Sequence, residues 1–401
     1  MVQTPPIGFT KTCFAVFVAE SLLAGGGTLP LWLVSAHGDG APRPARARTT
    51  RPDDRLLTGV SCASTRACVA SGQENRGQGD LALAARWNGR KWSIERPPTP
   101  SATFALEAVS CAARSACAAV GDFARGSRLI TFAERWNGRR WMRERTPSPG
   151  LVTYLHGVSC AMPKTCVAVG YSTVPSDAIL TERWNGRRWS TMPAADQGVS
   201  QPRLNSVACP ASTACTAVGT SKGQTYEGLQ WRLPLAEQWR AGHWRVAAGI
   251  PLQVGTVSAD LTAVSCSSTN ACTAVGSYYD GVTTRPLIER RNGSTWTIQR
   301  WPTTAPDVML TGVSCSSRTA CMTIGYTSNP ERPAAGGWNG TRWRIKPPRN
   351  PRGALAAEFS GISCASPNAC VAVGAFLSHQ AAWSDLVERW NGHNWAIQPT
   401  P

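Results

Sequence analysis

The sequence from Leu57 to Pro401 repeats one pattern seven times. The core of the pattern is V-S-C-x5-C-x-A-V-G, then a stretch of variable length, then E-R-W-N-G-x-x-W and a proline-rich end, with single positions replaced in several copies. The first cysteine of the pattern recurs every 49 residues, with one longer step of 57 residues between Cys209 and Cys266. A period of about 40 to 50 residues is typical of propeller blades and solenoid coils. We therefore treat each copy, numbered repeat 1 to repeat 7, as one supersecondary unit.

Each repeat contains four short strand patterns and no helical periodicity. In repeat 3 the patterns cover residues 155–160, 166–169, 180–184 and a fourth strand from 189. Asn185-Gly186 predicts a two-residue hairpin turn, because both positions favour positive φ. The sequence therefore predicts an all-β, seven-bladed β-propeller over residues 56–401, with four antiparallel strands in each blade. A right-handed β-solenoid is the alternative, but its coils are shorter and do not need two hairpins per repeat.

The cysteine pairs predict one disulfide in each blade. Their two cysteines lie on either side of the first hairpin, where neighbouring strands reach disulfide geometry. Metal binding is the alternative, but zinc needs four converging ligands, whereas each pair belongs to a separate repeat and the chain has only five histidines. No metal is expected. The predicted pairs are Cys62–Cys68, Cys111–Cys117, Cys160–Cys166, Cys209–Cys215, Cys266–Cys272, Cys315–Cys321 and Cys364–Cys370.

Thirteen of the 17 tryptophans occupy the W-x4-W part of the pattern. Such regularity predicts packing between neighbouring blades and not seven ligand sites. In repeat 5 Arg291 stands where the first tryptophan is expected, and only Trp296 remains. A glutamate recurs in the third strand and is interpreted as a cross-strand partner, at Glu134, Glu182, Glu237, Glu289 and Glu388.

The N-terminal residues predict export. Residues 1–36 contain a long apolar run and end in small residues, which indicates a signal peptide or an uncleaved hydrophobic anchor. Residues 37–55 are rich in Gly, Pro and Arg and are interpreted as a flexible linker. Seven disulfides need an oxidising compartment, so we expect a secreted or envelope-anchored protein. Contact with a membrane is expected only through residues 12–36, and only if they are not removed.

The net charge of +17 comes mostly from arginine. A basic balance suggests polyanionic partners without choosing among them. Nucleic acid is not expected, because the arginines are spread through all repeats and the chain is expected outside the cell. No phosphate loop, dinucleotide fingerprint, HExxH or GxSxG occurs, so no cofactor is expected.

Comparison of the repeats with one another predicts which face of the propeller binds a ligand. The cysteine spacing and the turn between third and fourth strands never change in length, whereas the stretches between second and third strands and between repeats do. In a four-stranded blade both constant turns lie on one face and both variable loops on the other, and variable loops on a fixed scaffold commonly carry binding. The aromatic residues of these loops either stack on a sugar or plug the centre of the ring: Phe123, Tyr171, Tyr226, Trp231, Tyr278, Tyr326, Phe376 and Trp383.

The turn from Arg291 to Trp296, which reads R-N-G-S-T-W, resembles the Asp-box of sialidase-type propellers, although the other six repeats lack the Asp and usually the Thr. In Asp-box families this motif is structural and lies away from the active site. Over nearly all of residues 57–401 the repeat resembles uncharacterised secreted propeller-like repeat proteins of actinobacteria, which implies an extracellular location and no established activity.

The sequence therefore predicts a secreted, monomeric, non-enzymatic binding module for a glycan or other cell-surface polymer. One alternative is a polysaccharide hydrolase or lyase of the sialidase-like type. Acidic residues lie scattered over the variable loops, and no acid and nucleophile pair can be assigned among Asp80, Asp122, Asp177, Glu227, Asp280, Glu331 and Asp385. Trp231-Arg232-Leu233-Pro234 is faintly similar to an Arg-x-Pro element of those enzymes, but it lies in repeat 4 and not ahead of repeat 1. The other alternative is a protein-binding scaffold of the envelope.

Overall fold

A computed structural model describes residues 54–75, 80–98, 104–174, 176–195, 198–226, 229–247, 249–302, 307–380 and 382–400. The described residues all belong to one compact unit, which lies within Pro52–Pro401. The predicted signal or anchor segment and all of the predicted linker except its last two residues lie outside the described residues. Among the residues that are described, no helix has the length and apolarity needed to span a membrane.

Repeats 1 to 4 each form four consecutive strands. Their bounds are β1 (Asp54–Ser64), β2 (Ala67–Asn75), β3 (Asp80–Trp87), β4 (Trp92–Glu95), β5 (Phe104–Ala113), β6 (Ala116–Arg125), β7 (Arg128–Trp136), β8 (Trp141–Arg145), β9 (Val152–Met162), β10 (Thr165–Val174), β11 (Ala178–Trp184), β12 (Trp189–Thr191), β13 (Arg203–Ala211), β14 (Ala214–Tyr226), β15 (Leu229–Arg240) and β16 (His243–Val246).

Repeats 5 to 7 follow the same plan. Their strands are β17 (Ser258–Ser268), β18 (Ala271–Tyr279), β19 (Thr284–Asn292), β20 (Thr295–Ile298), β21 (Val308–Ser317), β22 (Ala320–Ser328), β23 (Glu331–Trp338), β24 (Trp343–Ile345), β25 (Ala354–Ser366), β26 (Ala369–Ser378), β27 (Trp383–Trp390) and β28 (Trp395–Ile397).

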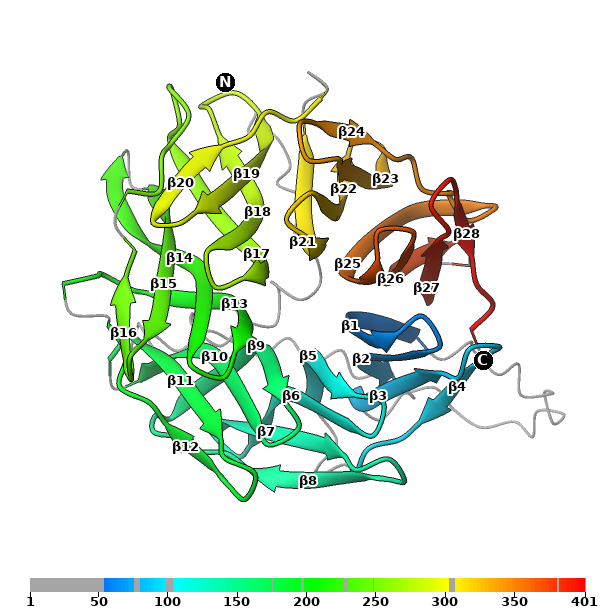
Figure 1. Ribbon diagram of the computed structural model, residues 1–401, viewed down its shortest axis with the longest axis horizontal. Helices are drawn as coiled ribbons and strands as arrows, with labels where there is room; N and C mark the ends of the chain where they lie inside the picture. Colours follow the sequence, from blue (N-terminus) through cyan, green and yellow to red (C-terminus); the bar gives the residue numbers. More distant parts are fainter. Residues whose placement is uncertain are drawn as a thin grey trace, which may run out of the picture. The chain divides into compact units, whose positions relative to one another are not determined.

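Each repeat folds into its own antiparallel sheet, in which sequential strands are neighbours. A single parallel pairing, Leu129 with Val152, also joins the sheets of repeats 2 and 3. The seven sheets lie around a common centre, with the first strand of each repeat innermost and the fourth outermost (Figure 1). The all-β prediction and the four-stranded repeat are confirmed.

All seven predicted disulfides are present. In each repeat the two cysteines lie opposite one another on the first two strands, with Cα atoms 3.9 to 4.1 Å apart. The short spacing of the pattern therefore places the sulfur atoms together by hairpin geometry alone.

In every repeat a steric restriction explains why the A-V-G pattern ends in glycine. In repeat 3 a Cβ on Gly170 would overlap the carbonyl oxygen of Tyr154 on the neighbouring inner strand. The strand register shifts at this point, between Val169 and Gly170. Such a bulge brings two backbones closer than a side chain allows. The same overlap occurs at the equivalent glycines Gly72, Gly121, Gly219, Gly276, Gly325 and Gly374.

The serine of the V-S-C pattern links each inner strand to the next. Its hydroxyl oxygen accepts a hydrogen bond of 2.9 Å from the first cysteine's backbone N–H in the following repeat. These bonds are Cys111 to Ser61, Cys160 to Ser110, Cys209 to Ser159, Cys315 to Ser265, Cys364 to Ser314 and Cys62 to Ser363. Between repeats 4 and 5, where Ala208 replaces the serine, Ser206 Oγ instead accepts from the N–H of Val264 at 3.2 Å.

The tryptophans pack as predicted. All thirteen are buried, and the six complete pairs lie across the third and fourth strands with ring centroids 5.7 to 5.9 Å apart. The arginine of E-R-W packs over the tryptophan of the next repeat, which explains its recurrence. These contacts are Arg86 over Trp136, Arg135 over Trp184, Arg290 over Trp338 and Arg389 over Trp87.

The prediction of a two-residue Asn-Gly turn was wrong. In repeat 3 Trp184 pairs directly with Trp189, so the turn has four residues, 185–188. Only Gly186 takes a positive φ. The Asn185 side chain accepts hydrogen bonds from the N–H groups of Arg187 and Arg188, and these side-chain bonds hold the longer turn. A two-residue turn with both φ values positive occurs instead in repeat 4, at Ala241 and Gly242.

Candidate functional site

The structure places the two constant turns of each repeat on one face, which we call the turn face. In repeat 3 a methyl group on Gly186 would lie 3.1 Å from the side chain of Lys164, in the disulfide hairpin. The variable loops meet on the opposite face, which we call the loop face. There the N–H of Leu151, in the connection from repeat 2, bonds the carbonyl of Val174, at the end of the second strand. The predicted separation of constant and variable segments is therefore present.

Three of the predicted ligand-binding aromatic residues are buried. Phe123, Tyr171 and Tyr326 expose 6, 3 and 8% of their surface, so their rings pack inside the sheets near the loop face. Tyr278, Phe376 and the two tryptophans, Trp231 and Trp383, are partly exposed. The side chain of Tyr226 lies outside the described residues. The predicted ring of aromatic residues is thus divided between the core and the surface.

Tyr171, on the second strand of repeat 3, stacks with residues of the inner strands of repeats 3 and 4. Its ring centroid lies 4.7 Å from that of Tyr154 and 5.5 Å from that of His156. The guanidinium carbon of Arg203 lies 4.5 Å from the Tyr171 centroid. Burial, helped by the nearby charge of Arg203, lowers the pKa of His156 to about 4, so the imidazole is neutral at pH 7. The cluster packs the centre of the ring.

The exposed aromatic residues gather where repeats 4 and 5 meet. The hairpin of β14 and β15 contains most of the eight extra residues of repeat 4, and the connection to repeat 5 contains the rest. The hairpin lies against repeat 5, because the N–H of Arg232 donates to Ser258 Oγ at 3.1 Å. Trp231 of this hairpin stacks on Tyr279 of β18, with centroids 6.1 Å apart and ring planes 17° apart. Both side chains are partly exposed. Among the described residues, the indole N–H of Trp231 has no hydrogen-bond partner.

Charged groups flank this stack. Asp280 follows Tyr279 directly, and its carboxylate accepts a hydrogen bond of 2.6 Å from Arg285 Nε. The Arg285 bond, with the N–H groups of Thr283 and Val282, holds the pKa of Asp280 well below its usual range. Asp280 is therefore ionised at neutral pH and orders the loop between β18 and β19. Arg232, which follows Trp231 directly, is exposed.

Two pairs of acidic residues have raised pKa values. Burial raises the pKa of Glu107 to about 7, and burial with the charge of Glu107 raises that of Asp122 well above its usual value. In repeats 6 and 7 burial likewise raises the pKa of Glu331 and that of Glu358. Glycoside hydrolysis needs a protonated acid beside an ionised base or nucleophile. In both pairs the two carboxyls shift in the same direction, and the shifts alone assign neither an acid nor a nucleophile.

The other predicted acids are held structurally or stand apart. Asp80 accepts a hydrogen bond from the Asn75 amide, and Asp177 is exposed. Burial raises the pKa of Asp385. Glu227 lies outside the described residues. No group of three or more His, Cys, Asp or Glu side chains suited to a metal ion occurs in the part of the chain that the structure describes.

No protein-family model matches the sequence, and no curated protein matches it either. Solved structures are similar to the fold. YCF48 bound to a D1 peptide gives a TM-score of 0.53 at 12% identity, over 84% of this chain and 93% of that chain. YCF48 from Cyanidioschyzon merolae gives 0.52 at 13% identity, over 86% and 98%. A six-bladed propeller lectin from Aleuria aurantia gives 0.48 at 9% identity, over 87% and 98%.

The chain folds as a β-propeller. Identities this low concern the fold alone, and the assignment agrees with the ring of four-stranded sheets. Tyr279 was not predicted from the sequence. Its only signal there is that it follows Tyr278, which makes repeat 5 the one repeat with two adjacent tyrosines. The cluster of Tyr154, His156 and Arg203 was not predicted either, because these residue types do not recur at the equivalent inner-strand positions of the other repeats.

Proposed function

We propose that this chain is a secreted, seven-bladed propeller that acts as a binding module and holds a glycan on its loop face, where repeats 4 and 5 meet. The observation that carries the proposal is the stack of Trp231 on Tyr279. Nearly parallel aromatic rings, partly open to solvent, offer a flat apolar surface that suits the C–H face of a sugar ring. Arg232 and the Asp280–Arg285 pair place hydrogen-bonding groups beside it.

The repeats themselves support this choice of location. Repeat 4 is the one with eight additional residues, and most of them lengthen the hairpin that carries Trp231. An insertion on a constant scaffold is typical of a binding loop. The seven disulfides support an oxidising compartment and hence an extracellular location.

A protein or peptide ligand is the second candidate. Two valines on the loop face of repeat 5, Val254 and Val282, expose 103 and 83% of their surface beside the same loops. The similar structure of YCF48 was solved with a D1 peptide, so a propeller of this kind can present a peptide site. Exposed aliphatic side chains suit a peptide better than a sugar.

A glycan array with the purified protein tests the proposal, with low-salt and high-salt washes. We expect retention of a defined sugar that survives high salt and is lost in Trp231→Ala and Tyr279→Ala. Trp383→Ala is the matched control, since Trp383 is a partly exposed aromatic residue of repeat 7, and it should bind as the parent does. Binding that disappears in salt indicates only the +17 charge. Binding that survives in both variants contradicts the site, and capture of a defined peptide in place of sugar favours the second candidate.

A further inference from the structure

One of the seven disulfides has a different neighbour. In every repeat the second cysteine lies directly opposite one residue of the third strand. In six repeats that residue is tryptophan, whereas Cys272 of repeat 5 lies opposite Arg291. The six tryptophan pairings are Cys68 with Trp87, Cys117 with Trp136, Cys166 with Trp184, Cys215 with Trp239, Cys321 with Trp338 and Cys370 with Trp390.

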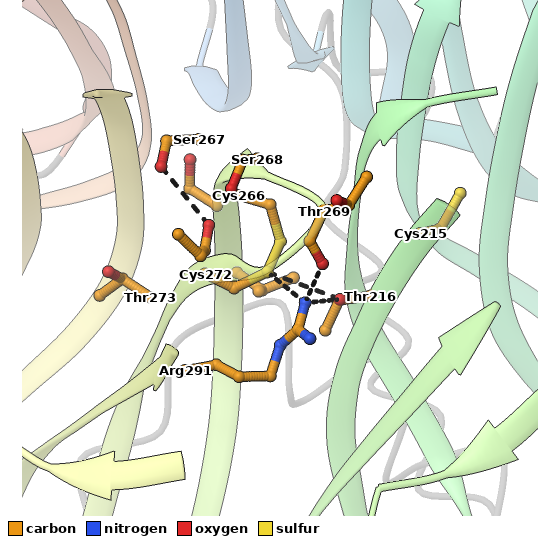
Figure 2. Close-up of a disulfide and its surroundings, with 12 residues drawn as sticks. Cys215, Thr216, Cys266, Ser267, Ser268, Thr269, Cys272, Thr273 and Arg291 are labelled. Carbon is orange, nitrogen blue, oxygen red and sulfur yellow. Dashed lines mark hydrogen bonds between the residues drawn. A yellow bond between two sulfur atoms is a disulfide. The ribbon is translucent and has the colours of Figure 1, made fainter. Parts of the chain in front are cut away.

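The guanidinium of Arg291 is aimed at the disulfide (Figure 2). Its Nη2 lies 3.0 Å from Cys272 Sγ and donates to Thr216 Oγ1 at 3.1 Å and to the carbonyl of Thr269 at 3.0 Å. Thr216 Oγ1 in turn lies 3.6 Å from Cys272 Sγ. Arg291 itself exposes only 3% of its surface. A cation and a hydroxyl group therefore contact one sulfur atom in a largely dry environment.

A second substitution accompanies Arg291. Repeat 4 has Gln238 where E-R-W has its arginine, and Gln238 Oε1 accepts a hydrogen bond of 3.3 Å from Arg291 Nη1. At four other junctions the arginine of one repeat covers the tryptophan of the next, as Arg290 covers Trp338 at 4.2 Å. Between repeats 4 and 5 the cation has moved into the tryptophan position, next to the sulfur.

The positive charge beside Cys272 is not neutralised by the groups that Arg291 contacts. Its hydrogen-bond partners are neutral oxygens and the sulfur. Burial, with the nearby charge of Arg240, lowers the pKa of Arg291 to about 10, so the side chain remains protonated at neutral pH. A neighbouring cation stabilises a thiolate, whereas the apolar indole at the other six sites does not.

We propose that Cys266–Cys272 is a thiol-exchange site, the disulfide of this protein that a small thiol reductant opens first. The reductant thiolate attacks Sγ of Cys266, the less buried cysteine of the pair. The S–S bond breaks, and Cys272 leaves as a thiolate that Arg291 and Thr216 stabilise. A second reductant thiolate then attacks the mixed disulfide and releases Cys266. Two thiols of the reductant are oxidised to one disulfide, and one protein disulfide is reduced to two cysteine thiols. A better leaving group leaves faster and favours the reduced form.

The proposal is independent of the glycan site, and the wild-type protein alone gives the first test. The full chain is incubated with limiting dithiothreitol or glutathione, quenched with acid and alkylated, and each cysteine is quantified by peptide mass spectrometry. We expect Cys266 and Cys272 to be reduced about tenfold in preference to the other six pairs, the change in equilibrium constant that about 30 mV makes in a two-electron couple. Equal labelling of all seven pairs, or earlier labelling of another pair, overturns the proposal.

Variants at Arg291 distinguish an effect of its positive charge from an effect of where this disulfide lies in the fold. The double variant Arg291→Trp with Gln238→Arg restores the pattern of the other repeats, and we expect the preference for Cys266 and Cys272 to disappear. Arg291→Lys keeps a cation and should keep most of the preference. If the restored double variant still opens this disulfide first, exposure of the hairpin and not the arginine governs its reactivity, and the proposal fails.

Discussion

The backbone N–H of Cys62, in the first repeat, donates a hydrogen bond of 2.9 Å to the hydroxyl of Ser363, in the last. Five junctions between consecutive repeats have the same bond at the same length. The first and last repeats also meet through the carboxylate of Asp54, which accepts from the N–H of Trp383, and through Arg389 over Trp87. The ring is therefore closed by the contacts that join neighbouring repeats, and the four strands of each repeat are consecutive in the chain.

Replacing the closing serine tests this relationship. Ser363→Ala leaves the N–H of Cys62 without its acceptor, and we expect a loss of about 1 kcal/mol in the free energy of unfolding. Ser110→Ala, at an internal junction, is the matched control and should cost a similar amount. Urea unfolding of both variants measures the difference. A loss at Ser110 with none at Ser363 contradicts closure through this bond.

The glycine of the A-V-G pattern should not tolerate a methyl group. In Gly170→Ala the new Cβ meets the carbonyl oxygen of Tyr154, which belongs to a paired backbone and cannot move aside. We expect a loss of roughly 3 kcal/mol or more in the free energy of unfolding, or no folded protein. Gly337→Ala, where the new atom meets only the flexible side chain of Lys346 at 3.4 Å, should change stability by less than about 0.5 kcal/mol. Comparable losses in both variants contradict the steric argument.

The buried aromatic residues should behave as core residues. Tyr171→Ala removes a ring that exposes 3% of its surface, and we expect the free energy of unfolding to fall by roughly 3 to 5 kcal/mol. Tyr171→Phe retains the stacking on Tyr154 and loses the hydroxyl group, which accepts a contact of 3.4 Å from Arg203, so about 1 kcal/mol is expected. Chemical denaturation measures both. An alanine variant of full stability that loses ligand binding would instead place Tyr171 in the ligand site.

Buried glutamates should make the protein more stable at mildly acidic pH. Burial raises the pKa of Glu134 to about 8 and that of Glu289 to about 8. Between the unfolded value of 4.5 and about 8 the unfolded chain is ionised and the folded chain is protonated at these sites. The contribution of each glutamate to the free energy of unfolding is therefore greatest below pH 4.5. Between pH 4.5 and about 8 that free energy falls, by up to about 1.4 kcal/mol per pH unit for each glutamate.

Thermal unfolding between pH 4.5 and 9 measures this slope. Glu134→Gln and Glu289→Gln remove one titrating group each and should flatten the profile in steps. Glu95→Gln is the control, because Glu95 is a partly exposed carboxylate paired with Arg86 at 2.6 Å. A melting temperature that rises with pH, or a slope that the glutamine variants leave unchanged, contradicts the prediction.

The candidate site was predicted only in part from the sequence. The loop face follows from chain lengths, because a constant spacing indicates a fixed turn and a variable spacing a surface loop. The same comparison could not tell that Tyr171 is buried by Arg203 of the next repeat, whereas Trp231 stacks on Tyr279 and stays partly open. Whether each ring is buried or exposed depends on contacts between different repeats, and the sequence pattern of a single repeat does not predict such contacts. The length of the Asn-Gly turn was misjudged because Asn185 accepts two backbone hydrogen bonds through its side chain.

By itself the sequence determined the strands, the sheet unit and the seven disulfides, since each depends on interactions within about 40 residues of one repeat. Tertiary structure decided how the repeats join. The bond from Cys62 to Ser363 and the packing of an arginine over the tryptophan of the next repeat, as Arg389 over Trp87, join different repeats. The hydrogen bonds of Arg291 to Thr216 and Gln238 likewise cross from repeat 5 to repeat 4. These contacts form only when the sheets surround a common centre, because that arrangement brings side chains from separate repeats within hydrogen-bonding distance.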